Sequence, residues 1–281
     1  MSVSVFDPTR CTLGEGALWH PEREQLFWFD ILEHRLMTRE GDRTRHWQFD
    51  EHVSAAGWID HDRLLIASET ALFTFDLRDN SRRDLVALEA DKPENRSNDG
   101  RADPQGGFWI GTMGKNAENG SGAIYRFYRG ELRKLRSVLT ITNSICFSPD
   151  GTQVYFADTA SQTVWRQGLD ADGWPVGEPA RFLDLKAQGL DPDGAVTDAE
   201  GRFWCAHWGA GEVTCYGTNG KRLSSFAVPA RQPTCPAFGG PGLTRLFLTS
   251  AAVGLDGADD GKTFVIDADG LHGLPAPQVR L

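Results

Sequence analysis

Short hydrophobic runs recur along the chain, each preceded by a turn rich in Gly, Asp or Pro. They are too short, and too often interrupted by Gly and Pro, to be helices. A segment of alternating polar and hydrophobic positions follows each run, and this alternation is typical of a half-buried β-strand. The six runs are LFWF (26–29), LLIA (64–67), FWIG (108–111), VYFA (154–157), FWCA (203–206) and LFLT (246–249).

The alternating segments complete a repeated unit. HRLMTRE (34–40), TALFTFD (70–76) and GEVTCYG (211–217) are three of them, and a weaker strand such as HWQFD (46–50) follows. Four strands that return about every 45 residues form the blade of a β-propeller. We therefore predict an all-β fold, a six-bladed β-propeller that occupies the whole chain (1–281) as a single domain.

A propeller also has to close its ring. We expect SVSVF (2–6) to pair with strands from the end of the chain, because this pairing removes exposed strand edges. A β-sandwich is the alternative all-β architecture, but it does not predict a sixfold repeat.

In a propeller the first strand of each blade lines a central channel, so equivalent residues are expected to face one another. Two carboxylates and an amide oxygen among them suit one divalent cation. Without a cation the two carboxylates would repel each other, and one would have to be protonated. Aligning the repeats on their hydrophobic runs makes these residues equivalent: Glu15, Ser54 (loose by one position), Asn98, Asn143, Asp193 and Cys235.

Each of these residues also has a structural explanation. Asn98 and Asp193 stand in common turn sequences, Glu15 could be a solvated loop acid, and Asn143 could cap a strand end. Their shared position in separate repeats favours a metal-binding channel, while Cys235 has no assigned role. The seven His residues show no ligand spacing, and no HExxH, GxSxG or P-loop motif is present.

Composition narrows the choice of partners. A formal net charge of −10 argues against nucleic acid and anionic membranes. No hydrophobic run approaches the roughly 20 residues that span a bilayer. MSVSVFDPTR (1–10) lacks the basic region and hydrophobic core of a signal peptide, which predicts a cytoplasmic protein. Five cysteines without a CxxC pair fit neither a disulfide framework nor a zinc knuckle, so we expect them to be reduced.

Five segments together resemble the regucalcin (senescence marker protein) and gluconolactonase family, especially its bacterial sugar lactonases. The resemblance implies a six-bladed propeller with one divalent metal in the channel, bound by Glu15, Asn143 and Asp193. It implies substrate contacts for Arg96 and Asn98, and less directly for Glu118. The segments are LGEGALWHP (13–21), RSNDGRADPQGGFWIGTM (96–113), ITNSICFSPDG (141–151), DPDGAVTDAEGRFWCAHWG (191–209) and PTCPAFGG (233–240).

The activity that follows is metal-dependent hydrolysis of a sugar lactone, an aldono- or aldarolactone, to the open acid. The cation, which is Ca²⁺, Mg²⁺, Mn²⁺, Zn²⁺ or Fe²⁺, would polarise the carbonyl while Asp193 activates water. The expected partner is a small sugar lactone, and the expected assembly is a monomer or a weak homo-oligomer. Two alternatives stay open: a phosphotriesterase or other esterase using the same metal site, and a non-catalytic calcium-binding or scaffold propeller.

Overall fold

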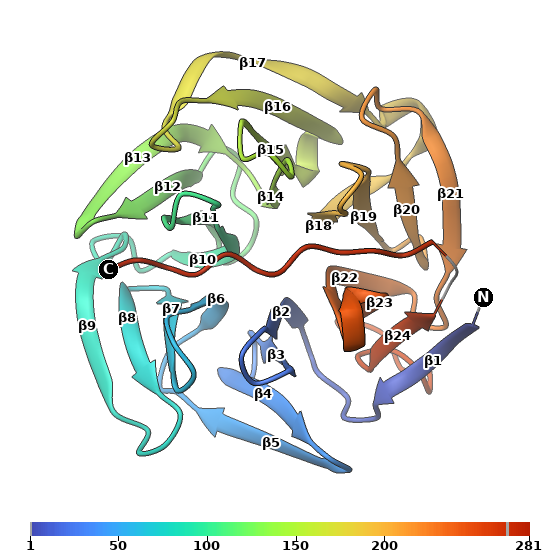
Figure 1. Cartoon of the computed structure of the whole chain (residues 1–281), viewed down its shortest axis with the longest axis horizontal. Helices are drawn as coiled ribbons and strands as arrows, with labels where there is room; N and C mark the ends of the chain where they lie inside the picture. The colour runs from blue at the N-terminus through green and yellow to red at the C-terminus, as the bar shows by residue number, and fades with distance from the viewer. Residues whose placement is uncertain (1, 268–269) are drawn as a thin grey trace.

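Six radially arranged sheets form the molecule. The structure is a computed structural model that describes residues 2–267 and 270–281. In these residues the chain builds six four-stranded antiparallel sheets around a central axis (Figure 1). The chain is a six-bladed β-propeller, as the repeat predicts, and each hydrophobic run lies in the second strand of its blade.

The strands follow the chain from blade to blade, except in the last blade. Blade one consists of β2 (Gly14–His20), β3 (Gln25–Asp30), β4 (Arg35–Glu40) and β5 (Arg43–Gln48). Blade two consists of β6 (Val53–Trp58), β7 (Arg63–Ser68), β8 (Ala71–Asp76) and β9 (Arg82–Ala87). Blade three consists of β10 (Asn95–Ala102), β11 (Phe108–Gly114), β12 (Gly122–Tyr128) and β13 (Glu131–Leu139). Blade four consists of β14 (Thr142–Phe147), β15 (Gln153–Asp158), β16 (Thr163–Leu169) and β17 (Pro175–Asp184). Blade five consists of β18 (Asp191–Thr197), β19 (Phe203–Trp208), β20 (Glu212–Tyr216) and β21 (Arg222–Ala227). Blade six consists of β22 (Gln232–Gly239), β23 (Arg245–Ala251), β24 (Thr263–Asp267) and β1 (Ser2–Asp7).

The last blade takes its outer strand from the beginning of the chain. β1 pairs antiparallel with β24, and Ser2 lies opposite Asp267. The predicted ring closure is therefore confirmed, and it removes two free strand edges that could pair with other chains.

Helical structure is confined to single turns. The described residues contain three 3₁₀ turns, at Thr159–Ser161, Lys186–Gln188 and Pro241–Leu243. None of the described helices has the length and hydrophobicity needed to cross a membrane.

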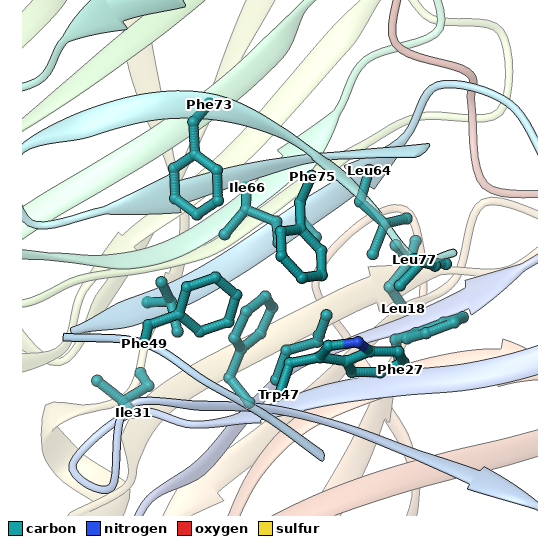
Figure 2. Close-up of a cluster of buried hydrophobic side chains, with 14 of the residues drawn as sticks. Leu18, Phe27, Ile31, Trp47, Phe49, Leu64, Ile66, Phe73, Phe75 and Leu77 are labelled. Atoms are coloured by element: carbon teal, nitrogen blue, oxygen red, sulfur yellow. The ribbon is translucent and has the colours of Figure 1, made fainter. Parts of the chain in front are cut away.

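Aromatic and aliphatic side chains fill the spaces between blades. Figure 2 shows the cluster between the first two blades, where Phe27, Trp47 and Phe49 face Ile66 and Phe75. The rings of Phe49 and Phe75 lie 5.3 Å apart and those of Trp47 and Phe75 lie 6.2 Å apart. Alternation within each strand directs these side chains to the sheet faces, so burial between blades is the main source of stability.

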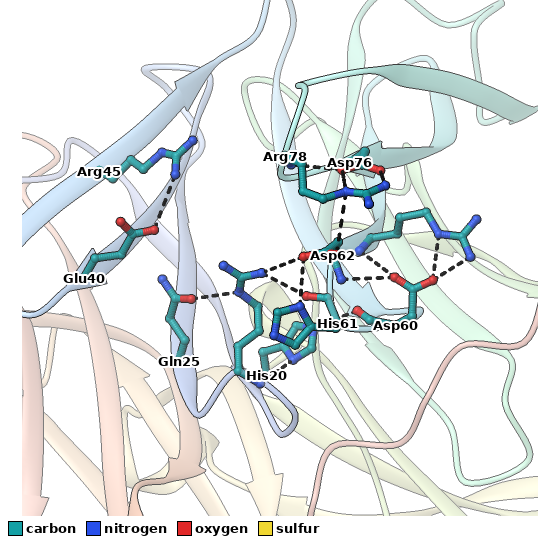
Figure 3. A network of polar contacts seen from close by, with 11 residues as sticks. His20, Gln25, Glu40, Arg45, Asp60, His61, Asp62, Asp76 and Arg78 are labelled. Carbon is teal, nitrogen blue, oxygen red and sulfur yellow. Dashed lines mark hydrogen bonds and ion pairs between the residues drawn. The ribbon is translucent and has the colours of Figure 1, made fainter.

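A polar network joins the loops of the same two blades near the ends of β2 and β6 (Figure 3). Arg23 donates to Asp62 Oδ1 over 3.1 Å and to the His61 carbonyl over 3.0 Å. His20 Nε2 lies 3.0 Å from the Asp60 carbonyl. The ion pair is partly exposed, so it contributes little compared with the hydrophobic cluster.

A segment that the repeat pattern does not predict crosses one face of the ring. This C-terminal strap (residues 270–281) runs over the end of the channel, from blade six towards blade three (Figure 1). Val279 N donates to the Trp58 carbonyl over 2.9 Å, and Trp58 Nε1 donates to the Ala276 carbonyl over 2.7 Å. A Cβ on Gly57 would lie 2.5 Å from Val279 Cγ2, so glycine makes room for the buried valine.

Candidate metal centre

The beginnings of four first strands meet around a cavity of about 260 Å³, at the end of the channel away from the C-terminal strap. β2, β10, β14 and β18 each supply polar side chains to its lining. The side chains are between 3% and 7% exposed, so their charges and dipoles are largely removed from bulk water. The structure thus brings together five predicted site residues: Glu15, Arg96, Asn98, Asn143 and Asp193.

β-Bulges direct these side chains into the channel. The pairing of β2 with β3 shifts after Glu15, that of β14 with β15 shifts after Asn143, and that of β18 with β19 shifts after Pro192. A bulge re-aims the side chains beside it and increases the local twist. Next to Glu15, Gly16 has φ +58° and a Cβ there would lie 2.2 Å from the Ser54 carbonyl oxygen, so a larger residue would push the strands apart.

Two aspartates outside the cavity hold the segments that carry Glu15 and Asn143. Asp30, at the end of β3, accepts hydrogen bonds from the backbone N–H groups of residues 12 and 13 at 2.9 and 3.0 Å. Asp158, at the end of β15, accepts the same pair from residues 140 and 141 at 3.1 and 3.0 Å. Two of the six repeats therefore carry a positioning aspartate as well as a candidate ligand, and the acid directly after LFWF (26–29) and VYFA (154–157) is its sequence signal.

Asn98 connects Arg96 with Asn143. Its Oδ1 accepts from Arg96 Nη1 over 2.7 Å, while its Nδ2 donates to the Thr142 carbonyl over 2.8 Å and to Asn143 Oδ1 over 3.2 Å. Arg96 Nη1 also donates to the Ser97 carbonyl, but Nε and Nη2 make no hydrogen bond to the described residues. Arg96 therefore keeps donors available for a ligand in the cavity.

The orientation of Asn143 is fixed from its other side. Asn143 Nδ2 donates to Thr159 Oγ1 over 2.9 Å, and Thr159 in turn donates to the Pro192 carbonyl over 2.7 Å. The amide nitrogen is thus engaged away from the acids, and Oδ1 retains acceptor capacity for a cation. Thr159 was not a predicted site residue, because its role depends on the turn that follows β15.

The pKa values of the two carboxyl groups in this cavity, Glu15 and Asp193, are raised. The pKa of Glu15 is raised to about 8, chiefly by burial and to a smaller extent by repulsion from Asp99. Burial, followed by repulsion from Glu15, raises the pKa of Asp193 well above its usual range. Burial also lowers the pKa of Arg96 to about 10, although Glu15 and Asp193 oppose that effect. Arg96 therefore compensates only part of the negative charge that Glu15 and Asp193 would carry if both were ionised.

This arrangement fits a divalent cation. Asp99 adds a third buried acid, whose Oδ1 has no hydrogen-bond partner among the described residues. A dication would offset the repulsion that raises the pKa values of Glu15 and Asp193. The described residues contain no group of three His, Cys, Asp or Glu side chains arranged to bind a metal. The donor set would therefore be two carboxylates and the amide oxygen of Asn143, and oxygen donors suit hard cations.

The remaining lining of the cavity is mostly apolar and was not predicted. Lys115 is the exception, and its Nζ lies 2.9 Å from Glu69 Oε2, which also lies 2.5 Å from His52 Nδ1. These residues come from loops of different blades, so no local sequence pattern predicts that they lie together. The apolar part of the lining consists of Leu13, Leu32, Met113, Ile141, Trp208 and Val253.

Three residues of interest lie elsewhere. Ser54 and Cys235 do not line the cavity: Ser54 donates to Ser97 Oγ over 2.7 Å, and the Cys235 thiol lies 3.9 Å from Arg101 Nη2. Glu118 is exposed and accepts a hydrogen bond from Asn116 Nδ2 over 2.9 Å. The predicted ring of six equivalent residues therefore contributes four to the cavity.

The chain is similar to known proteins over nearly all of its length. Residues 13–252 match the SMP-30/gluconolactonase/LRE-like region. The chain belongs to this family. It is 38% identical to an L-arabinolactonase of Azospirillum brasilense over 280 residues, which cover 94% of the chain and 91% of the relative. It is 33% identical to a pentonolactonase of Haloferax volcanii over 273 residues, which cover 96% of the chain and 92% of the relative.

A solved member of the SMP-30/gluconolactonase family has nearly the same structure. The crystal structure of regucalcin from Agrobacterium tumefaciens, described as a calcium-binding protein, superposes with a TM-score of 0.96 at 40% identity. The match covers 100% of this chain and 98% of that one. The predicted family resemblance is therefore confirmed.

Proposed function

We propose that the protein hydrolyses a sugar lactone to the open sugar acid and that Glu15, Asn143 and Asp193 hold one divalent cation. The observation that carries this proposal is the convergence of these three side chains on one cavity, beside the free donors of Arg96. The names of the relatives, an L-arabinolactonase and a pentonolactonase, support a lactone as the substrate. The calcium-binding regucalcin supports a divalent cation, with Ca²⁺, Mg²⁺, Mn²⁺, Zn²⁺ or Fe²⁺ as candidates.

The residues of the cavity divide the work of ester hydrolysis. A bound dication would polarise the lactone carbonyl and stabilise the negative charge that develops on its oxygen. Asp193 accepts a proton from the attacking water, whose oxygen bonds to the carbonyl carbon. When the ring C–O bond breaks, Asp193 returns the proton to the departing alkoxide. Arg96 donates hydrogen bonds to substrate oxygens, and Asn98 holds its guanidinium in place.

The apolar lining completes this division. Leu13, Met113 and Ile141 surround the polar groups and limit the access of bulk water. Electrostatic interactions inside such a cavity are stronger than those in water. Glu118 lies outside the lining and is exposed, so we assign it no direct contact with the lactone.

Acid release from a panel of lactones tests the proposal. The panel contains pentono-, hexono- and aldarolactones, together with a phosphotriester, and each is assayed with native, chelated and metal-reconstituted protein. We expect lactone hydrolysis that chelation abolishes and one added cation restores. Undiminished hydrolysis by fully chelated protein would contradict the metal assignment. Hydrolysis of the phosphotriester alone would favour a phosphotriesterase, and no turnover of either class would favour a binding propeller.

A further inference from the structure

The other end of the channel contains a second and larger cavity of about 390 Å³. The C-terminal strap closes it from outside, and Leu274 and Pro275 lie both in the cavity lining and at the protein surface. Its volume falls in the range of roughly 300–1,000 Å³ that is usual for small-molecule sites. The inner wall is apolar and partly aromatic, with Leu18, Trp19, Phe147 and Phe238 among its side chains.

Arg101 is the one charged side chain in this lining among the described residues. Its Nε donates to the Ile145 carbonyl and its Nη2 donates to the Ala195 carbonyl, both over 3.1 Å. These bonds fix the guanidinium plane across blades three, four and five. Nη1 makes no hydrogen bond to any described residue, so a donor on a fixed cation is left for a ligand.

The acid that interacts electrostatically with Arg101 does not use this donor. Asp99 makes no ion pair with Arg101 among the described residues, and its Oδ2 accepts a hydrogen bond from Ile145 N over 2.6 Å. A guanidinium group in apolar surroundings is stabilised by an anion that reaches it. A single cation on an apolar wall suits a monoanion with a hydrocarbon body. A sugar lactone with several hydroxyl groups would find few polar partners here.

We propose that this strap cavity is a second binding site, which takes a medium-chain carboxylate with its head group on Arg101 and its hydrocarbon chain against Phe147, Phe238 and the strap. The proposal rests on the residues of this cavity and not on the lactone reaction. It assigns the strap a second role besides packing, because Leu274, Pro275 and Ala276 form the outer wall of the ligand site.

Titration calorimetry with octanoate tests the site in the full-length protein. We expect saturable binding with a Kd below about 1 mM, which is reasonable for a ligand of this size. Arg101→Gln and Ala276→Phe should each weaken binding by about tenfold or more, through the lost charge-assisted bond and the filled volume respectively. Arg101→Lys should retain most of the affinity. Arg280→Gln is the matched control, because Arg280 is an exposed strap arginine outside the lining.

Several outcomes would overturn this assignment. They include the absence of saturable binding, and affinity that neither Arg101→Gln nor Ala276→Phe changes. Equal affinity for 1-octanol would remove the role of the carboxylate. Displacement of octanoate by a sugar acid, with no effect of Ala276→Phe, would place octanoate in the metal-side cavity, which Glu15, Asn143 and Asp193 line. Circular dichroism checks that each variant is folded; should Arg101→Gln unfold, Ala276→Phe and the comparison with 1-octanol still decide the question. Failure of octanoate to bind would leave the lactonase proposal unaffected.

Discussion

The two ends of the central channel are built by the same strands but have opposite chemical character. β2 presents Glu15 at one end and Trp19 at the other, while β14 presents Asn143 and Phe147. The cavity at the polar end collects buried charges that raise one another's pKa values, whereas the strap end collects apolar side chains and a single cation. The first strands therefore place polar candidate ligands at their beginnings and mostly apolar side chains at their ends.

The bulges mark the boundary between these two ends. Glu15 pairs with Phe29 across β3, but after the bulge Leu18 pairs with Phe27 and the regular register continues. The first strand of each blade has such a shift in its pairing with the second strand, and in four blades the shift lies beside a residue of the candidate site. Substitutions at the two ends should consequently separate activity from stability, with activity lost at the polar end and stability lost at the strap end.

The largest expected effect is that of Asp193→Asn. This change keeps the size of the side chain but removes the proposed base and one negative charge, so kcat should fall by about 10³-fold or more. Stability should be unchanged or raised, because the variant relieves repulsion between buried acids. Steady-state kinetics and thermal melting measure the two effects. Asp191→Asn, two residues away on β18, is the control; equal loss in both variants would contradict the assignment.

The second prediction concerns pH and metal removal. Because the pKa of Glu15 is raised, the metal-free folded protein keeps a proton on this side chain between pH 4.5 and about 8. The unfolded chain has released that proton in the same pH range. The free energy of unfolding should therefore fall as pH rises through this window, by at most about 1.4 kcal/mol per pH unit from this group. Denaturant titrations of chelated protein at several pH values measure this slope.

Two comparisons identify the source of that slope. Glu15→Gln should reduce the slope in chelated protein, where the buried Asp193 still contributes. Saturating cation should flatten it in the wild type, because the cation favours the ionised form of both acids. A slope that is the same in all three samples would assign the pH dependence to other groups.

For Val279, at the strap end, the expected effect is on stability and not on lactone turnover. Val279 is 2% exposed and packs in the hydrophobic cluster that includes Ala55, Leu65 and Phe108. Val279→Ala should cost about 2 kcal/mol of unfolding free energy while leaving kcat unchanged. Val176→Ala, at an exposed valine in β17, is the matched control and should cost little. A loss of kcat in a folded Val279→Ala variant would link the two ends of the channel.

The smallest effect is expected at Glu118. This side chain is exposed and lies outside the metal-side cavity, so Glu118→Gln should change kcat/KM by no more than about threefold. Asn98→Ala is the contrasting variant, since it frees Arg96 and removes a hydrogen bond from Asn143. A large loss for Glu118→Gln would show that the loop around it contacts the substrate.

The propeller could be predicted because each blade carries its own local pattern. LFWF (26–29) becomes the middle of β3, and its four side chains are almost completely buried, as expected for a strand between two packed faces. The C-terminal strap could not be predicted in this way. Its Pro275 and Pro277 interrupt any periodic pattern, and its position is set by contacts with distant blades, such as that of Val279 with Gly57.

The candidate site was only partly predictable for a related reason. Repeat spacing identified Glu15, Asn143 and Asp193 because these residues hold similar places in separate blades. The same spacing also included Ser54 and Cys235, which do not reach the cavity, because one residue in a bulge changes which side chain faces the channel. Lys115 follows the end of β11 and Trp208 is the last residue of β19, so their place at the cavity depends on the assembled ring.

The pairing of β1 with β24 also has a consequence during synthesis. Residues 2–7 are synthesised before residues 8–262, and only then do their partners at 263–267 follow. Until then the unpaired β1 segment can associate with the strand edges of other nascent chains. We therefore expect the sixth sheet to form last, and slow translation or overexpression to favour aggregation through this segment.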